Sequence, residues 1–175
     1  MNLPNKLTVL RVVLIPIFIV VLMTGHYYIS AIIFVAASLT DALDGAIARK
    51  YNLVTNFGKI MDPLADKLLV TAAMVCLVEL GDIPAWMVFV ILAREFTITS
   101  LRSVAASEGI VIAAGKSGKI KTILQMTAIV AILIRNYPFE ALNIPVADGL
   151  LWAAVLMTIY SGAEYIIQNR KLFSM

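Results

Sequence analysis

Long apolar runs recur along the whole chain, and they limit its fold more than any other feature of the sequence. A helix that crosses the hydrocarbon core of a bilayer needs about 20 apolar residues, with a range of about 17–25. Breaks rich in Gly, Pro, Asn or Asp separate the runs. They predict six helical spans, at residues 10–24, 29–48, 63–81, 84–102, 121–136 and 147–167. We therefore expect an all-α, polytopic membrane protein.

The composition supports this expectation. Hydrophobic residues make up 61% of the 175 residues and charged residues 14%, with a mean hydropathy of +0.93. Soluble domains average roughly 45–50% apolar and about 25% charged residues. The length predicts one membrane domain over residues 1–175, in which the stretch 1–8 lies along the membrane surface. A single cysteine, Cys76, excludes a disulfide within the chain.

The basic residues predict an orientation for these spans. If the N-terminus is cytoplasmic, every Lys and Arg lies on the inner side except Arg135, in an outer loop, and Arg94, inside the fourth span. Such a bias is the usual sign of cytoplasmic loops. We expect a multi-pass protein of the inner (cytoplasmic) membrane with both termini in the cytoplasm, surrounded by membrane lipid and without a nucleic-acid partner.

Four aspartates near the cytoplasmic side carry the chemical signal. Asp41 and Asp44 are three positions apart on the second span, and Asp62 and Asp66 are four apart on the third, so each pair shares a helix face. A short loop makes the two helices antiparallel neighbours. All four carboxylates should therefore meet at one depth, in a polar cavity that faces the cytoplasm.

Carboxylates near a bilayer are costly, on the order of 3 kcal/mol each at the centre of a span, and they repel one another. A divalent cation removes both problems, and oxygen ligands favour Mg²⁺ or Mn²⁺. Two bound ions suit displacement at phosphorus, and one carboxylate can take a proton from an attacking hydroxyl. The small residues Gly45 and Ala48 on the same face leave room for a ligand, although they also suit helix packing.

The stretch from residue 41 to residue 66 resembles the signature of the CDP-alcohol phosphatidyltransferases, D-x2-D-G-x2-A-R-x8-G-x3-D-x3-D. Every defined position is filled, by Asp41, Asp44, Gly45, Ala48, Arg49, Gly58, Asp62 and Asp66. The resemblance implies a six-span enzyme in which the four aspartates hold two Mg²⁺ or Mn²⁺ ions on the CDP pyrophosphate. It implies Asp66 as general base, and Gly45, Ala48, Arg49 and Gly58, with Asp41 and Asp44, as residues that bind CDP-diacylglycerol.

Further motifs extend the resemblance to the branch of this family whose acceptor is sn-glycerol 3-phosphate. They are the opening from Asn2 to Arg11, Ala93-Arg94-Glu95 with Arg102, and Gly118 to Thr122 with Gln125-Met126. The resemblance implies phosphatidylglycerophosphate and CMP as products, and a homodimer is left open.

A phosphorylated acceptor needs cationic donors beyond those on the nucleotide. The candidates for the acceptor phosphate are Arg11, Arg94, Arg102, Lys116, Lys119 and Lys121. Lysines of an inner loop also serve as topology determinants and contacts to lipid headgroups, and Glu95 also suits simple pairing with a neighbouring Arg.

Three other interpretations remain open at this point. The same chemistry suits other alcohol acceptors, such as inositol phosphate or serine. Carboxylates within spans also mark ion pathways in transporters. Here, however, all four acids lie at one end of their helices beside Arg49 and Lys59, which suits an anionic substrate better. An inactive paralogue is the third, although every position of the signature is filled.

Overall fold

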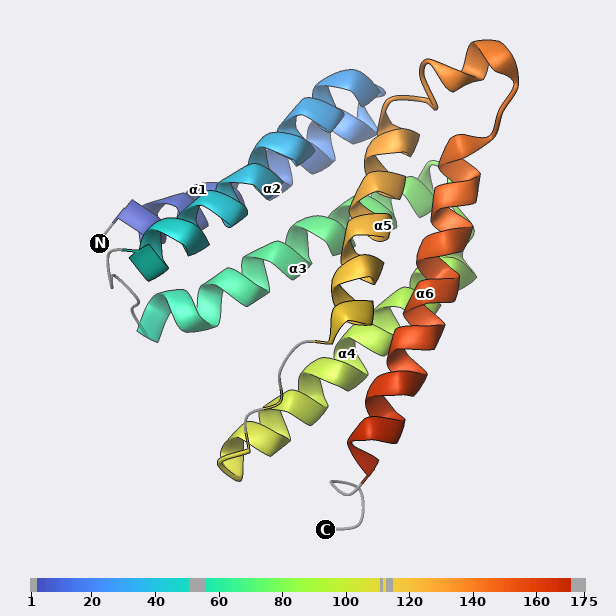
Figure 1. The fold of residues 1–175 in the computed structure, drawn as a ribbon. Coiled ribbons are helices and arrows are strands. Elements are labelled where there is room, and N and C mark those ends of the chain that lie inside the picture. Colours follow the sequence, from blue (N-terminus) through green and yellow to red (C-terminus); the bar gives the residue numbers. More distant parts are fainter. Residues whose placement is uncertain (1–2, 51–55, 111, 113–114, 171–175) are drawn as a thin grey trace. The chain divides into compact units, whose positions relative to one another are not determined.

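The computed structural model describes residues 3–50, 56–110, 112 and 115–170, and within its helices the side chains at 3–4, 41–50, 56–60 and 62–63 lie outside the described part. Figure 1 shows the course of the chain. The helices are α1 (Leu3–Met23), α2 (Tyr27–Lys50), α3 (Asn56–Glu79), α4 (Ala85–Ser107), α5 (Lys116–Leu133), the 3-10 helix η1 (Phe139–Leu142) and α6 (Val146–Gln168). These ranges hold no strand, which confirms the all-α prediction.

Several helices extend beyond the apolar runs that predicted them. α3 begins at Asn56 rather than residue 63, and α4 continues to Ser107 rather than ending at residue 102. Residues 3–8, expected as a separate surface segment, form the first turns of α1. The thickness of the bilayer sets the length of an apolar run. The helix itself can continue through polar flanking residues as long as its backbone hydrogen bonds are made.

Two helices of the described residues are long and apolar enough to cross a membrane by length and composition. They cover Asn5–Met23, with a mean hydropathy of 2.4, and Val146–Gln168, with 1.5, and the apolar helix Tyr27–Thr40 is shorter. Charged residues interrupt other helices; α4, for example, carries Arg94, Glu95 and Arg102. The six membrane spans thus stay a prediction.

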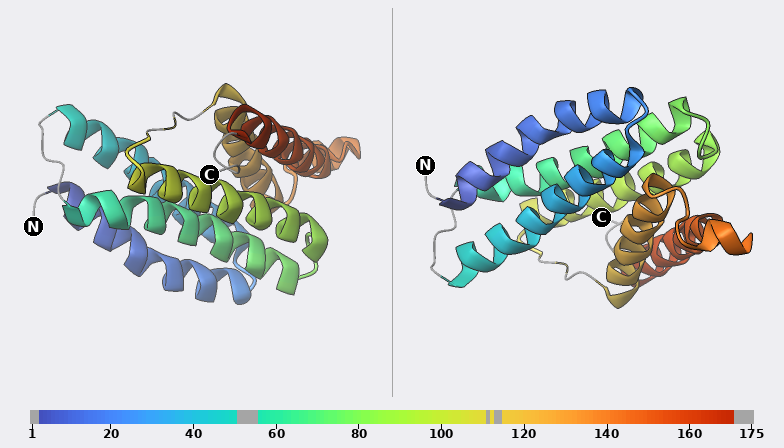
Figure 2. Two further views of the ribbon diagram at one scale, coloured as in Figure 1. Left: turned by 90° about the horizontal axis from the view of Figure 1, so that it is seen from below. Right: turned by 90° about the horizontal axis from the view of Figure 1, so that it is seen from above.

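The chain divides into two compact units, and the first comprises residues 1–82 and 133–135. Its three helices, α1, α2 and α3, contact one another and lie side by side in both views of Figure 2. Phe18 of α1 and Phe34 of α2 are fully buried, with ring centroids 6.0 Å apart, and Leu69 and Leu77 of α3 complete this core.

Three polar residues close the end of unit 1 at which α2 begins. α1 turns into α2 through Gly25, whose φ of +85° is readily adopted only by glycine. At the start of α2, the Tyr27 hydroxyl donates to Asp82 Oδ2 at 2.7 Å. Arg135 Nη1 lies 3.4 Å from Asp82 Oδ1, and its guanidinium carbon lies 4.3 Å from the centroid of the Tyr27 ring. We call Tyr27, Asp82 and Arg135 the polar clasp.

The second unit comprises residues 83–132 and 136–175, and α4 contacts α6 in it. At one end of this contact, the rings of Trp86 and Trp152 lie 5.5 Å apart. The buried face of α6 is rich in small and hydroxyl-bearing residues, including Ala154, Thr158 and Gly162. Small side chains let membrane helices approach closely, because packing rather than hydrophobicity drives their association.

The core of unit 1 leads to a stability prediction. Phe34→Ala should lower the free energy of unfolding by about 3 kcal/mol, because it opens a cavity against Phe18. Ile32→Ala is the matched control on α2, since Phe34 is 0% exposed and Ile32 is 69% exposed. Thermal unfolding of the detergent-solubilised variants measures both. Equal destabilisation by the two changes would contradict the described burial.

Candidate functional site

The aspartate signature lies on α2 and α3, two helices of unit 1 that contact each other. Asp41 and Asp44 lie in the C-terminal half of α2, and Asp62 and Asp66 lie in the N-terminal half of α3. Both pairs stand on continuous helix, so that each pair shares a helix face, as its spacing predicts.

Most side chains of this signature lie outside the described part of the structure. The residues concerned are Asp41, Asp44, Gly45, Ala48, Arg49, Gly58 and Asp62. Asp66 is described and is partly buried. Among the described side chains, no three His, Cys, Asp or Glu residues come together. The four aspartates as a donor set offer oxygen only, which fits a hard divalent ion. Their coordination geometry stays a prediction.

α1 presents a buried polar stripe at the same end of unit 1. Asn5, Thr8 and Arg11 follow one another at three-residue spacing, and all three are buried. Arg11 Nε donates to the carbonyl oxygen of Ala37 at 3.2 Å, about one helical turn before Asp41 on α2. Arg11, which we predicted to bind the acceptor phosphate, thus also ties α1 to the α2 backbone. The sequence contains a signal for this stripe, because the spacing of three residues from Thr8 to Arg11 places both on one helix face. We did not predict the stripe from the sequence.

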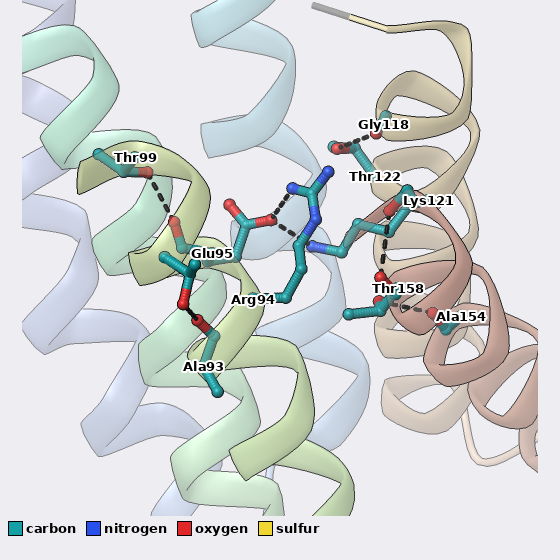
Figure 3. Close-up of polar contacts among 11 residues, drawn as sticks. Ala93, Arg94, Glu95, Thr99, Gly118, Lys121, Thr122, Ala154 and Thr158 are labelled. Atoms are coloured by element: carbon teal, nitrogen blue, oxygen red, sulfur yellow. Dashed lines mark hydrogen bonds and ion pairs between the residues drawn. The ribbon is translucent and has the colours of Figure 1, made fainter. Parts of the chain in front are cut away.

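In unit 2, two cations from different helices converge on one carboxylate oxygen (Figure 3). Arg94 Nη1 lies 2.9 Å from Glu95 Oε1, and Lys121 Nζ lies 2.8 Å from the same oxygen. Arg94 and Glu95 are on α4, and Lys121 is on α5. Their side chains are 15%, 23% and 2% exposed, respectively. We call Arg94, Glu95 and Lys121 the charged trio.

The trio refines two expectations. The predicted pairing of Glu95 with a neighbouring arginine is confirmed. Lys121, treated as one of three inner-loop lysines, is instead buried in α5. In addition, Arg94 Nε is buried and meets no hydrogen-bond partner in the described residues. A buried donor without a partner costs about 1–3 kcal/mol, so this atom is suited to an acceptor oxygen supplied by a ligand.

The other predicted acceptor-site residues of unit 2 are placed differently. Arg102 is exposed, and its Nη2 donates to the carbonyl oxygen of Ile112 at 3.0 Å. Lys116 and Lys119 are exposed on the first turn of α5. Of the five basic residues predicted in unit 2, the structure therefore brings together Arg94 and Lys121.

A complete aspartate signature on two contacting helices, in a chain whose described residues form helices and no strand, defines a class of protein. The sequence pattern of the CDP-alcohol phosphatidyltransferase family matches residues 1–160. This match covers most of the chain, which therefore belongs to that family.

Individual relatives match over nearly the whole length. The CDP-diacylglycerol–glycerol-3-phosphate 3-phosphatidyltransferase of Bacillus subtilis (strain 168) is 49% identical, over 96% of this chain and 95% of its own. The protein of the same name from Rickettsia felis is 37% identical, over 98% and 97%. A probable phosphatidylglycerophosphate synthase of Mycobacterium tuberculosis is 39% identical, over 94% of this chain and 80% of its own.

The trio predicts a stability effect that is specific to its carboxylate. Glu95→Gln should lower the free energy of unfolding by about 3 kcal/mol, because two mostly buried cations lose their shared counter-charge. Thermal unfolding in detergent measures this loss. Glu108→Gln, at the exposed C-terminal end of α4, is the matched control and should stay within about 0.5 kcal/mol of the parent. If Lys121→Met added to Glu95→Gln caused a further full loss, the pairing would be contradicted.

Proposed function

We propose that the chain transfers the phosphatidyl group from CDP-diacylglycerol to sn-glycerol 3-phosphate, giving phosphatidylglycerophosphate and CMP. One observation carries this proposal. The chain is 49% identical, over 96% of its length, to a protein named for this reaction. The complete signature from Asp41 to Asp66 supports the same chemistry.

The aspartates divide the chemical work in this proposal. Asp41, Asp44, Asp62 and Asp66 hold two Mg²⁺ or Mn²⁺ ions, in keeping with their oxygen-only chemistry. When bound, the ions neutralise the pyrophosphate of the nucleotide. Asp66 takes the proton from the acceptor hydroxyl, whose oxygen forms the new bond to the phosphorus that carries diacylglycerol. The bond from that phosphorus to the oxygen of CMP breaks, and CMP leaves with the electron pair.

Other residues of the signature bind the lipid nucleotide. Gly45, Ala48, Arg49 and Gly58 act here together with Asp41 and Asp44. Glycine and alanine leave space for the ligand near the helix backbone. The Arg49 guanidinium matches phosphate oxygens in charge and geometry.

The acceptor phosphate is bound by cationic side chains, principally Arg94 and Lys121. Support comes from their convergence on Glu95 Oε1 and from the buried Arg94 Nε, which a phosphate oxygen would satisfy. Arg11, Arg102, Lys116 and Lys119 are secondary candidates. An acceptor without a phosphate would gain nothing from these donors.

The membrane arrangement belongs to the same proposal. We place the chain in the inner (cytoplasmic) membrane as one domain of six spans, with both termini and a polar cavity on the cytoplasmic side. The one-sided distribution of Lys and Arg supports this orientation, and the two apolar helices α1 and α6 support insertion. Association into homodimers is compatible with it.

CMP release by the purified protein in detergent is the direct test of the function. We expect release only when CDP-diacylglycerol, Mg²⁺ or Mn²⁺, and glycerol 3-phosphate are all present, and loss of release on chelation by EDTA. Serine, inositol phosphate and glycerol serve as alternative acceptors. Release with one of these instead would correct the acceptor. Silence with every acceptor from a folded protein would overturn the transferase and revive the transporter interpretation.

Asp66 offers a sharper test of the mechanism. Asp66→Asn should lower kcat by at least about 100-fold, because general-base catalysis typically contributes 10²–10⁴-fold. Binding of CDP-diacylglycerol, measured by its protection against thermal unfolding, should be retained in large part. Asp148→Asn, an exposed acid in the first turn of α6, is the matched control. A kcat near the parent value would remove Asp66 from the role of base.

A further inference from the structure

Two glycines of unit 2 leave room for the side chain of Arg94. A Cβ atom built on Gly162 of α6 would lie 3.1 Å from Arg94 Cγ, and one built on Gly118 of α5 would lie 3.4 Å from Arg94 Nη2. Within 4 Å of these two positions, the described residues supply no other contact of this kind. One glycine thus borders the stem of the arginine and the other borders its guanidinium.

Backbone conformation does not account for these glycines. Both lie within helices, and neither has the positive φ that favours glycine, unlike Gly25 or Gly81. Inside a helix, glycine is less favourable than alanine. Close packing of helix backbones does not account for them either, because the atoms that a new Cβ would meet belong to the Arg94 side chain. The space at positions 118 and 162 is therefore occupied by Arg94.

Glu95 holds the arginine, and the glycines leave the space that it fills. Glu95 Oε1 lies 2.9 Å from Nη1, whereas a Cβ at position 162 would crowd Cγ and a Cβ at position 118 would touch Nη2. The remaining nitrogen, Nε, is buried and has no hydrogen-bond partner among the described residues. A guanidinium held in this way presents its donors at a set position, which lowers the cost of pairing them with two phosphate oxygens.

We infer that Gly162 and Gly118 are positioning residues, which seat Arg94 so that its guanidinium meets the phosphate of the acceptor alcohol. This inference rests on the proposed function, in which Arg94 binds that phosphate. It adds two residues that contact neither substrate and act through the arginine. Because the predicted contact at Gly162 is the tighter one, its influence is the greater.

The test is the steady-state kinetics of Gly162→Ala in the full-length protein in detergent. We expect the KM for glycerol 3-phosphate to rise by roughly threefold to tenfold. The new Cβ should displace Arg94 by a few tenths of an ångström, and a misplacement of a full 1 Å can lower the rate of an enzyme about 100-fold. The kcat and the KM for CDP-diacylglycerol should stay at the parent values. Gly118→Ala should give a smaller rise, since its Cβ would make an ordinary contact at 3.4 Å.

Gly149→Ala is the matched control on the same helix. A Cβ at Gly149 would meet nothing within 4 Å, so its kinetics should equal those of the parent. Gly149→Ala favours the helix and should not lower the unfolding temperature. At Gly162 the displacement of Arg94 opposes this gain, so the unfolding temperature of that variant is measured beside its kinetics. A purely structural role for Gly162 would change the unfolding temperature and leave the KM for glycerol 3-phosphate unchanged.

A double variant shows whether the effect passes through the arginine. Arg94→Ala removes the atoms that a new Cβ at position 162 would meet, so adding Gly162→Ala to Arg94→Ala should change the KM no further. A further rise of the KM in the double variant, or an unchanged KM in Gly162→Ala alone, would overturn the proposed positioning role of Gly162. If instead the parent protein released no CMP with glycerol 3-phosphate, the proposed function would fail, and the role of Arg94 with it.

Discussion

A positive charge among apolar helices is costly unless a partner or a ligand meets it, and this constraint organises both units of the chain. In unit 2, Arg94 and the buried Lys121 share one oxygen of Glu95, which joins α4 to α5. In unit 1, the buried Arg11 donates to a backbone carbonyl of α2. Lys121 and Arg11 each link two helices, so groups suited to anionic ligands are also structural contacts.

The proposed reaction uses groups of both signs, and the two proposed sets lie on different helices. The aspartates proposed to hold the metal ions lie on α2 and α3, whereas the trio proposed to bind the acceptor phosphate lies on α4 and α5. Further carboxylates placed directly beside the trio would neutralise its cations and weaken an anion site. In the proposed reaction, each set acts on a substrate group of opposite charge.

Much of this arrangement was predictable from the sequence because the relevant signals are local. Apolar runs located the helices, and the spacing of Asp41 from Asp44 placed them on one helix face. Helix ends were missed where polar residues continue the helix, as at Asn56 of α3. The burial of Lys121 was hidden because a basic run looks alike whether it faces water or a protein interior. The proximity of Gly162 to Arg94 was hidden because only the fold brings together these two residues, which are distant in sequence.

The polar clasp at the other end of unit 1 differs from these buried contacts in its response to the surrounding solution. Arg135 is 53% exposed and Asp82 18% exposed, so dissolved ions screen their attraction, which is worth at most about 1 kcal/mol. The Tyr27–Asp82 hydrogen bond depends less on ionic strength. High salt should thus loosen the hold on Arg135 more than the buried hydrogen bond between Arg11 and the Ala37 carbonyl, so these two contacts of unit 1 differ in their response to salt.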